Sequence, residues 1–547
     1  MAALLALFPP VGHDQLWCLY VAQRMLAGAK LYGPELFESN PPLIMWASLF
    51  LAHVAQLIHI PITVLFKLAV SSLGLASALI SLNILRRIYP TLTQATLWFL
   101  AFAYIVIFAV MPARDFGQRD HLLAILCLPY VLAAALDAIK HQPQNRVPHI
   151  SPLRCGFDPT PLPTSLRLLI AIAAAIGICL KPHNGLLILT TELLLMAFTI
   201  RRRRRASSLV LRPRNPIRPE LVTILATGAL YLLAVHKLTP DYLTQVVPLL
   251  KDVYWAIGHL SPFQLLGESI QLHILLAITL TALIGRGRHD RPAIFLLAAG
   301  IASTVAYYLQ GTGWYYQQIP ALSFTAAALA LLILPATDGC PIFATASSSL
   351  RWAEEPPDSK IARLLDHPTT PIAALALSLL ALLLTAHFTN YPFIPSRSFP
   401  IEAPDESFFT SLPPNTPVAV LTTSVDDTVM PTAKYHLLWA QRTNNLWILP
   451  ALLRNESGPP PQRAIPPARL AELEALQRRF MVEDLNRWHP KLILVNRCQD
   501  LHVQCQVIED RHDDLLAWFS RDPAFRAAFT PYRYAGSKGD FDAYTLP

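Results

Sequence analysis

The sequence predicts a mainly α-helical polytopic membrane protein, with about 11 transmembrane helices and a small α/β domain at its C-terminal end. Hydrophobic residues make up 53% of its 547 residues and charged residues 15%, and the mean hydropathy is +0.39. A chain of this composition has too little polar surface to cover itself in water. Apolar runs continue to Phe388, after which the sequence becomes rich in proline and charge. We therefore expect a membrane domain over residues 1–388 and a soluble domain over residues 389–547.

Apolar stretches of spanning length, roughly 17 to 25 residues, locate the transmembrane helices. They are Ile62–Leu85, Thr93–Met111, His121–Ala138, Glu220–Val235, Pro262–Ile284, Pro292–Leu309, Ile319–Pro335 and Pro371–Phe388. The run from 166 to 200 is too long for one span, and Pro182 and Gly185 interrupt it, so we expect two helices that meet at Lys181–Gly185. The N-terminal run MAALLALFPP is short for a crossing and indicates either a truncated or an unusually short first helix. It has no basic n-region, so we do not expect a cleaved signal peptide.

Basic residues alternate from one loop to the next, which orients the chain. The basic groups are Arg86 with Arg87, the Lys140–Arg167 loop, Arg201–Arg205 with Arg212, Arg214 and Arg218, Arg286 with Arg288 and Arg291, and Arg351 with Lys360 and Arg363. By the positive-inside rule these loops are cytoplasmic, which accounts for the net charge of +8 without a nucleic-acid partner. The outer segments are then Asp14–Pro42, Ala113–Asp120, Lys181–Gly185, Lys237–Ser261 and Gln310–Gln318.

The segment Leu43–Ile60 is apolar but carries His53, Gln56 and His59. If it crossed the membrane, every later loop would change sides and the five-arginine run would face outward. We therefore expect a helix that lies along the outer interface.

The last 159 residues, 389–547, contain the signals of a small α/β domain outside the membrane. PVAVLTT and KLILVNR are typical of buried strands, DDLLAWFSRDPAFRAAF of a helix, and YRYAGSKGDFDAYTL of a hairpin. Cys498 and Cys505 could form a disulfide or remain two thiols.

Asp14 is a functional candidate on physical grounds alone. An acidic side chain beside a bilayer costs free energy, so it usually has a chemical role, in an enzyme or a transporter. The alternative is structural, because an Asp can cap a helix that follows it, here over Leu16–Leu26.

The string DQLWCLYVAQRMLAGAKLYGPELFESNPPL, within a first outer loop at 11–60, resembles the first outer loop of the GT-C glycosyltransferase superfamily. It looks most like the branch that holds protein O-mannosyltransferases and the lipid A aminoarabinose transferase. Arg114–Asp120 followed by HLLAILCLPY is similar to the second outer loop of that family. AAIGICLKPHNGLLIL is similar to its Gly-to-Lys-Pro pattern between two helices.

The resemblance implies an enzyme of the cell membrane with an extracytoplasmic active site. Such enzymes transfer a sugar from a polyprenyl-phosphate carrier to an acceptor, which here could be a glycan, a lipid or a protein. Asp14 matches the catalytic acid of the family and would act as general base. Asp120 matches the second acid and would orient Arg119 or the acceptor, with Asp115 as the competing assignment.

The departing lipid phosphate gathers negative charge, so cationic donors should surround it. The candidate substrate-binding residues are Arg114, Arg119, Lys181, His183, Glu38, Asn40, Tyr315 and Tyr316. Arg119 and Lys181 are the preferred phosphate-binding pair, although either could be a residue that only snorkels to the interface. The two tyrosines lie in QGTGWYYQQ, whose aromatic residues could stack on a sugar or anchor the chain at the membrane boundary.

Two departures from the family pattern bear on metal binding. Gln15 follows Asp14 where the family often has a second acid, and Asn40 precedes PPL where it often has Lys or Glu. A hard cation needs several oxygen ligands, so we expect no cofactor and no obligatory metal, with a divalent metal as the open alternative.

Two other functions are alternatives that explain the sequence less well. A secondary transporter would show internal repeats and ionisable residues near the middle of the membrane, whereas these spans carry few charges apart from Glu192 and Lys67. A non-catalytic scaffold that displays the C-terminal domain would leave Asp14, Asp120 and Lys181 without a role.

Overall fold

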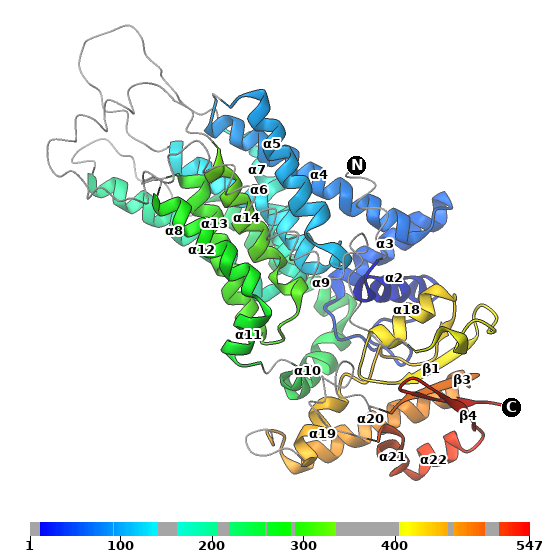
Figure 1. Cartoon of the computed structure of the whole chain (residues 1–547). Helices are drawn as coiled ribbons and strands as arrows, with labels where there is room; N and C mark the ends of the chain where they lie inside the picture. The colour runs from blue at the N-terminus through cyan, green and yellow to red at the C-terminus, as the bar shows by residue number, and fades with distance from the viewer. Residues whose placement is uncertain are drawn as a thin grey trace, which may run out of the picture. The chain divides into compact units, whose positions relative to one another are not determined.

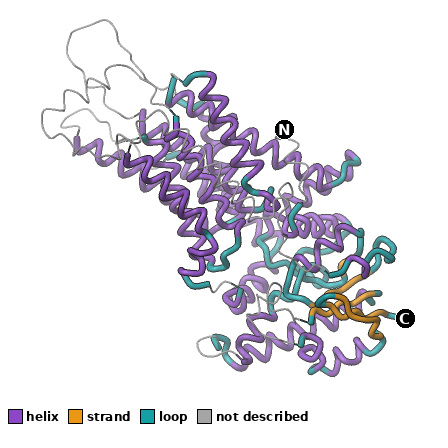
Figure 2. The backbone as a smooth tube through the Cα atoms, in the orientation of Figure 1, coloured by secondary structure: helices purple, strands orange, loops and turns teal. Residues whose placement is uncertain are grey.

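The computed structural model describes residues 11–90, 92–140, 161–205, 218–257, 260–285, 290–334, 404–457, 463–497 and 514–547. These residues form two compact units. As far as they are described, residues 67–231 and 260–334 form one, the helical unit, and residues 11–66, 232–257 and 404–547 form the other, the mixed unit. The strands are confined to the mixed unit among the described residues (Figure 2). The predicted boundary at residues 388 and 389 lies outside the described residues.

The helical unit consists of helices that lie side by side (Figure 1). They are most of α4 (Ile62–Ile88), α5 (Gln94–Ile105) with a π-helical turn at Val106–Val110, α6 (Arg119–Lys140), α7 (Thr164–Leu180), α8 (Gly185–Arg205), most of α9 (Pro219–Leu238), α11 (Pro262–Glu268), α12 (Ile270–Gly285), α13 (Arg291–Gln310) and α14 (Ile319–Ile333). Helices α6, α13 and α14 are mostly buried, whereas α4, α8 and α9 keep most of their apolar surface exposed. At the contact of α13 with α14, a Cβ added to Gly300 would lie 2.4 Å from Thr325 Oγ1, so glycine is required for the close approach.

The predicted break between 166 and 200 is confirmed. Helix α7 ends at Leu180, a 3₁₀ turn follows at Pro182–Asn184, and α8 begins at Gly185. Pro182 lacks the N–H that would continue the helix, and Lys181 leaves the helical conformation with φ −145° and ψ 81°.

The prediction of one continuous helix over Pro262–Ile284 is wrong, because α11 and α12 meet at Ser269 with a bend of 81°. At the bend, side chains from other elements donate hydrogen bonds to backbone carbonyl groups of α11. Tyr307 Oη donates to the Leu265 carbonyl at 3.3 Å, and Gln318 Nε2 donates to the Glu268 carbonyl at 3.0 Å. The backbone can therefore leave the helical ladder without unsatisfied acceptors.

Six described helices are long and apolar enough to cross a membrane, or seven if the bent pair is one span. The expected total of about 11 stays a prediction, because the N-terminal run and Pro371–Phe388 lie outside the described residues. The segment Leu43–Ile60 forms α3 (Pro42–Ile58), so its helical structure is confirmed, while its interfacial position stays a prediction.

The mixed unit contains a five-stranded sheet of order β2-β1-β3-β5-β4. Strand β1 (Pro417–Leu421) is parallel to β2 (Leu438–Trp439) and β3 (Leu492–Asn496), whereas β5 (Phe541–Thr545) is antiparallel to β3 and β4 (Arg533–Lys538). The two predicted buried strands and the predicted hairpin are confirmed. The helices of this part are α18 (Asp426–Lys434), α19 (Leu449–Ser457), α20 (Pro467–Trp488), α21 (Leu515–Ser520) and α22 (Pro523–Phe529).

The predicted single helix near the C-terminus is instead the pair α21 and α22. Asp522 accepts a hydrogen bond from the Ala524 N–H at 2.8 Å, and Pro523 occupies the first position of the new helix. A capping residue followed by proline is a start signal, and here it interrupts the apolar pattern. Cys498 and Cys505 lie outside the described residues, so the choice between a disulfide and two thiols stays open.

The segment near the N-terminus that was predicted to be an outer loop packs on the C-terminal sheet within the mixed unit. This segment forms α2 (His13–Leu26) and α3, and α10 (Val247–Val253) belongs to the same unit. Tyr20 Oη accepts from the Trp439 N–H at 3.0 Å, and the Phe37 N–H donates to the Arg442 carbonyl at 2.7 Å. The helix that carries Asp14 is thus attached to the domain at the far end of the chain.

Candidate functional site

The turn between α7 and α8 carries a lysine that pairs with an aspartate at the start of α6. Lys181 Nζ lies 3.0 Å from Asp120 Oδ2, and the two residues are 7% and 0% exposed. The contact is an ion pair outside hydrogen-bonding geometry, so both carboxylate oxygens of Asp120 keep their capacity to accept. Two buried charges so close together are stable only because each neutralises the other.

Three other side chains lie around this pair. Lys181 Nζ is 3.5 Å from Gln310 Oε1 at the end of α13, and 5.2 Å from the centre of the Tyr316 ring. The His183 ring interacts electrostatically with Lys181, Asp120 and Arg119. The structure therefore brings together five predicted site residues from three separate segments of the chain. They are Arg119 and Asp120, Lys181 and His183, and Tyr316.

Several buried polar atoms at this site have no hydrogen-bond partner among the described residues. They are both oxygens of Asp120, Nε2 of His183 and Nδ2 of Asn184. Buried polar groups in folded proteins are nearly always satisfied, and an unsatisfied one costs about 1–3 kcal/mol. The pattern indicates a place where water or a polar ligand completes the hydrogen bonds.

Three other candidate residues of the helical unit, Tyr315, Arg114 and Asp115, have no described contact with Lys181 or Asp120. Tyr315 Oη donates to the Met111 carbonyl at 2.7 Å, which fixes the loop rather than leaving the phenol for a ligand. Arg114 is exposed in the short turn Ala113–Asp115. Of the two competing acids, Asp120 is the one that pairs with Lys181, while Asp115 is buried in that turn.

Asp14 belongs to the mixed unit. It lies in the first turn of α2, whose N-cap position is Gly12, so Asp14 is not the cap residue that the structural alternative required. Its Oδ1 is 3.5 Å from His13 Nε2, and its side chain is 27% exposed. A negatively charged side chain in the first turn of a helix interacts favourably with the helix dipole.

Glu38 lies close to the helix that carries Asp14. It is 2% exposed and accepts from the indole Nε1 of Trp17, which is one turn after Asp14. It also accepts from the backbone N–H of Asn40 at 2.8 Å and from Asn40 Nδ2 at 2.7 Å. Glu38 and Asn40 therefore bind each other and α2, and their contact with a substrate stays a prediction.

Gln310 and Asn184 belong to the site but were not predicted as site residues. Asn184 had a signal, because KPHN is a polar interruption between two long apolar runs. Gln310 had none, since a single glutamine at the end of a helix is common. Among the described residues no group of three His, Cys, Asp or Glu side chains could hold a metal ion. Metal independence stays a prediction.

The length and apolar character of the described helices decide one point about this protein. The chain is a membrane protein.

No protein-family model matches the chain, and no curated protein matches it. Solved structures do match. ArnT from Cupriavidus metallidurans bound to undecaprenyl phosphate is 14% identical, with a TM-score of 0.48, over 100% of this chain and 96% of that one. The archaeal oligosaccharyltransferase AglB from Archaeoglobus fulgidus, in complex with an inhibitory peptide and a dolichol-phosphate, is 11% identical, with a TM-score of 0.42, over 100% and 73%. Structural similarity at these identities and TM-scores does not indicate which reaction this protein catalyses. The reaction has to be inferred from the residues of the site.

Proposed function

We propose that this protein transfers a glycosyl group from a polyprenyl-phosphate-linked sugar to an acceptor on the outer face of the membrane. The observation that carries the proposal is the buried pair of Lys181 and Asp120, which lies at helix ends beside unsatisfied polar atoms of His183 and Asn184.

The charges of this site suit a lipid phosphate. Arg119 and Lys181 provide two positive charges and Asp120 one negative charge, so the cluster has a net charge of about +1 at neutral pH. A sugar joined to a polyprenyl phosphate is a phosphodiester with one negative charge, and the released polyprenyl phosphate gains further negative charge. Cations in a buried place stabilise the developing charge more strongly than they would in water.

The unsatisfied atoms suit the same ligand. Nδ2 of Asn184 is a donor, and Nε2 of His183 is a donor in one of its two neutral tautomers. Phosphate oxygens accept hydrogen bonds from both. The oxygens of Asp120 can accept only from hydroxyl or N–H groups, so they favour a sugar or an acceptor hydroxyl beside the phosphate.

Asp14 would supply the base for the transfer. The acceptor hydroxyl attacks the anomeric carbon, the bond from that carbon to the phosphate oxygen breaks, and the hydroxyl proton passes to the Asp14 carboxylate. Polyprenyl phosphate leaves with the bonding electron pair.

A secondary transporter is the second candidate. It is favoured by charged residues inside the helical unit, among them Glu192 and Arg218, and by the broken helices at Lys181 and Ser269. These charges pair with one another, which leaves less reason to assign them to a moving ion.

Ligand-dependent thermal stability separates the two candidates. Undecaprenyl phosphate added to the detergent-solubilised protein should raise its melting temperature, because a ligand that binds only the folded state stabilises it. Lys181→Ala should reduce that rise. Arg86→Ala, which removes an exposed arginine at the end of α4, should leave it unchanged. A transporter of soluble solutes would show no rise with the lipid, and that result would overturn the proposal.

A further inference from the structure

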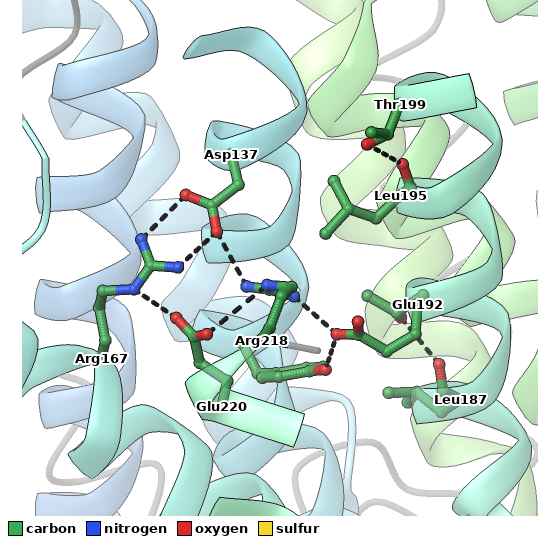
Figure 3. Close-up of polar contacts among 10 residues, drawn as sticks. Asp137, Arg167, Leu187, Glu192, Leu195, Thr199, Arg218 and Glu220 are labelled. Carbon is green, nitrogen blue, oxygen red and sulfur yellow. Dashed lines mark hydrogen bonds and ion pairs between the residues drawn. The ribbon is translucent and has the colours of Figure 1, made fainter. Parts of the chain in front are cut away.

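Five charged side chains form a mostly buried cluster in the helical unit (Figure 3). Its members are Asp137, Arg167, Glu192, Arg218 and Glu220. Arg167 donates two parallel hydrogen bonds to the carboxylate of Asp137, at 2.9 and 2.6 Å. Arg218 donates to Asp137 at 2.9 Å and to Glu192 at 2.6 Å. Glu220 contacts both arginines and is 1% exposed.

Charged groups in the interior of a membrane protein are costly and usually functional. In the sequence Arg218 belongs to a basic loop, and the proposed transfer chemistry uses none of the five residues. They must therefore be explained separately. Because the charges are mutually paired, a role in holding helices together fits better than a role in binding an ion.

The cluster and the candidate site hold opposite ends of the same helical hairpin. Asp120 lies in the first turn of α6 and Asp137 in its last turn. Arg167 lies in the first turn of α7, and Lys181 directly follows its last residue. The two helices are antiparallel, with one ion pair at each end, about 26 Å apart along α6 at a rise of about 1.5 Å per residue. A shift of one helix by a turn, about 5.4 Å, would break both pairs.

Arg218 also joins α8 to α6, because it contacts both Glu192 and Asp137. Glu192 lies on α8, which begins at Gly185, immediately after the turn that contains Lys181. Tyr130 of α6 also donates to Glu192. Both helices that flank Lys181 are thus tied to α6 by the cluster, through Arg167 on one side and Glu192 on the other.

We infer that the buried cluster is a set of positioning residues: it fixes the register of α7 and α8 on α6 and so holds Lys181 opposite Asp120. This inference rests on the proposed function for its catalytic consequence, but the register itself can be measured without any substrate.

A native cysteine gives the register a direct readout. A Cβ added to Gly177 on α7 would lie 3.3 Å from Cys127 Sγ on α6. Gly177→Cys should therefore form a disulfide with Cys127 only when the two helices keep their present register, since disulfide geometry tolerates little displacement. Gly177→Ser is the matched control for the added side chain.

The first measurement is the rate at which this disulfide forms under a mild oxidant. Removing Arg167 by Arg167→Gln leaves Asp137 with fewer donors, so bridging should slow at least about tenfold. Arg167→Lys keeps the charge but loses the planar guanidinium, so its bridging rate should lie between those of the parent and Arg167→Gln. This conservative variant keeps the test valid if Arg167→Gln does not fold. Arg86→Gln should bridge at the parental rate. Equal rates in all four backgrounds would show that the cluster does not set the register.

The second measurement connects the register to the site. In Arg167→Gln the rise in melting temperature with undecaprenyl phosphate should be smaller than in the parent. Closing the 127–177 disulfide should restore most of it, and reduction with dithiothreitol should remove it again. A full rise in unbridged Arg167→Gln would overturn the positioning role. If the parent itself shows no rise, the proposed function fails, while the bridging rates still decide whether the cluster sets the register.

Discussion

Lys181 and Asp120 meet at 3.0 Å although they come from different helices and both are nearly inaccessible to solvent. Removing one partner of such a pair leaves an isolated buried charge, which costs about 3–5 kcal/mol, whereas removing both costs much less. We expect Asp120→Asn and Lys181→Met each to lower the thermal stability of the protein markedly. The double variant should recover much of the loss yet remain inactive in sugar transfer. Additive losses in thermal melts would show that the two charges do not stabilise each other.

Asp14→Asn keeps the shape of the side chain but removes the base. Sugar transfer should fall by about 10²- to 10⁴-fold, the usual effect of losing a general base, with the melting temperature unchanged. Asp241→Asn is a suitable control, because Asp241 is in the same unit and makes an exposed ion pair with Lys30 at 2.7 Å. Transfer assays on both purified variants test the assignment. Parental activity in Asp14→Asn would leave Asp14 with only an electrostatic role at the start of its helix.

The alternation of basic loops predicts the sidedness of the chain. Reporter fusions after Arg205 and after Arg291 should report the cytoplasm, whereas fusions after Thr312 and beyond Phe388 should report the outer side. The readout is the activity of a pair of reporters that work only on opposite sides of the membrane. A cytoplasmic signal after Thr312 would contradict the placement of the whole candidate site.

The pKa of Asp484 predicts how the mixed unit responds to pH. Burial raises the pKa of this carboxyl to about 6, although the guanidinium and backbone N–H of Arg442 oppose the shift. The unfolded value is about 3.9, so folding favours the protonated form. The stability of the parent relative to Asp484→Asn should therefore be greatest below about pH 4, fall by up to about 3 kcal/mol as the pH rises to about 6, and stay level above that. Thermal melts of both proteins from pH 4 to 7 measure the difference. A difference that increased with pH would mean that Arg442 outweighs burial.

Much of the helical unit could be predicted from the sequence, because membrane helices have local signals. The apolar runs of spanning length are helical where the structure describes them, although Pro262–Ile284 forms two helices instead of one. The polar turn at Lys181 follows from one proline and its polar neighbours. The bend at Ser269 could not be predicted. It depends on Tyr307 and Gln318, which are distant in sequence and supply donors to the freed carbonyls.

The candidate site was predictable in part for a similar reason. Residue type and sidedness led to Lys181 and Asp120, since charges beside apolar runs are conspicuous. Residue type and sidedness do not predict which side chains a residue contacts. Glu38 carries a substrate-binding prediction, yet in the structure it accepts from Trp17 and Asn40. Arg218 counts as one more positive charge in a loop until the fold places it between two acids from different helices.

The order in which the paired charges are synthesised bears on how the chain enters the membrane. Asp137 and Arg167 are 30 residues apart and lie on consecutive helices, so α6 and α7 can enter the bilayer as a neutral hairpin as soon as both have left the ribosome. Glu192 enters with α8, but Arg218 is made 26 residues later, just before α9. Until then α8 carries an unneutralised carboxylate. We therefore expect α8 and α9 to enter the bilayer together, in an insertion step that follows that of α6 and α7.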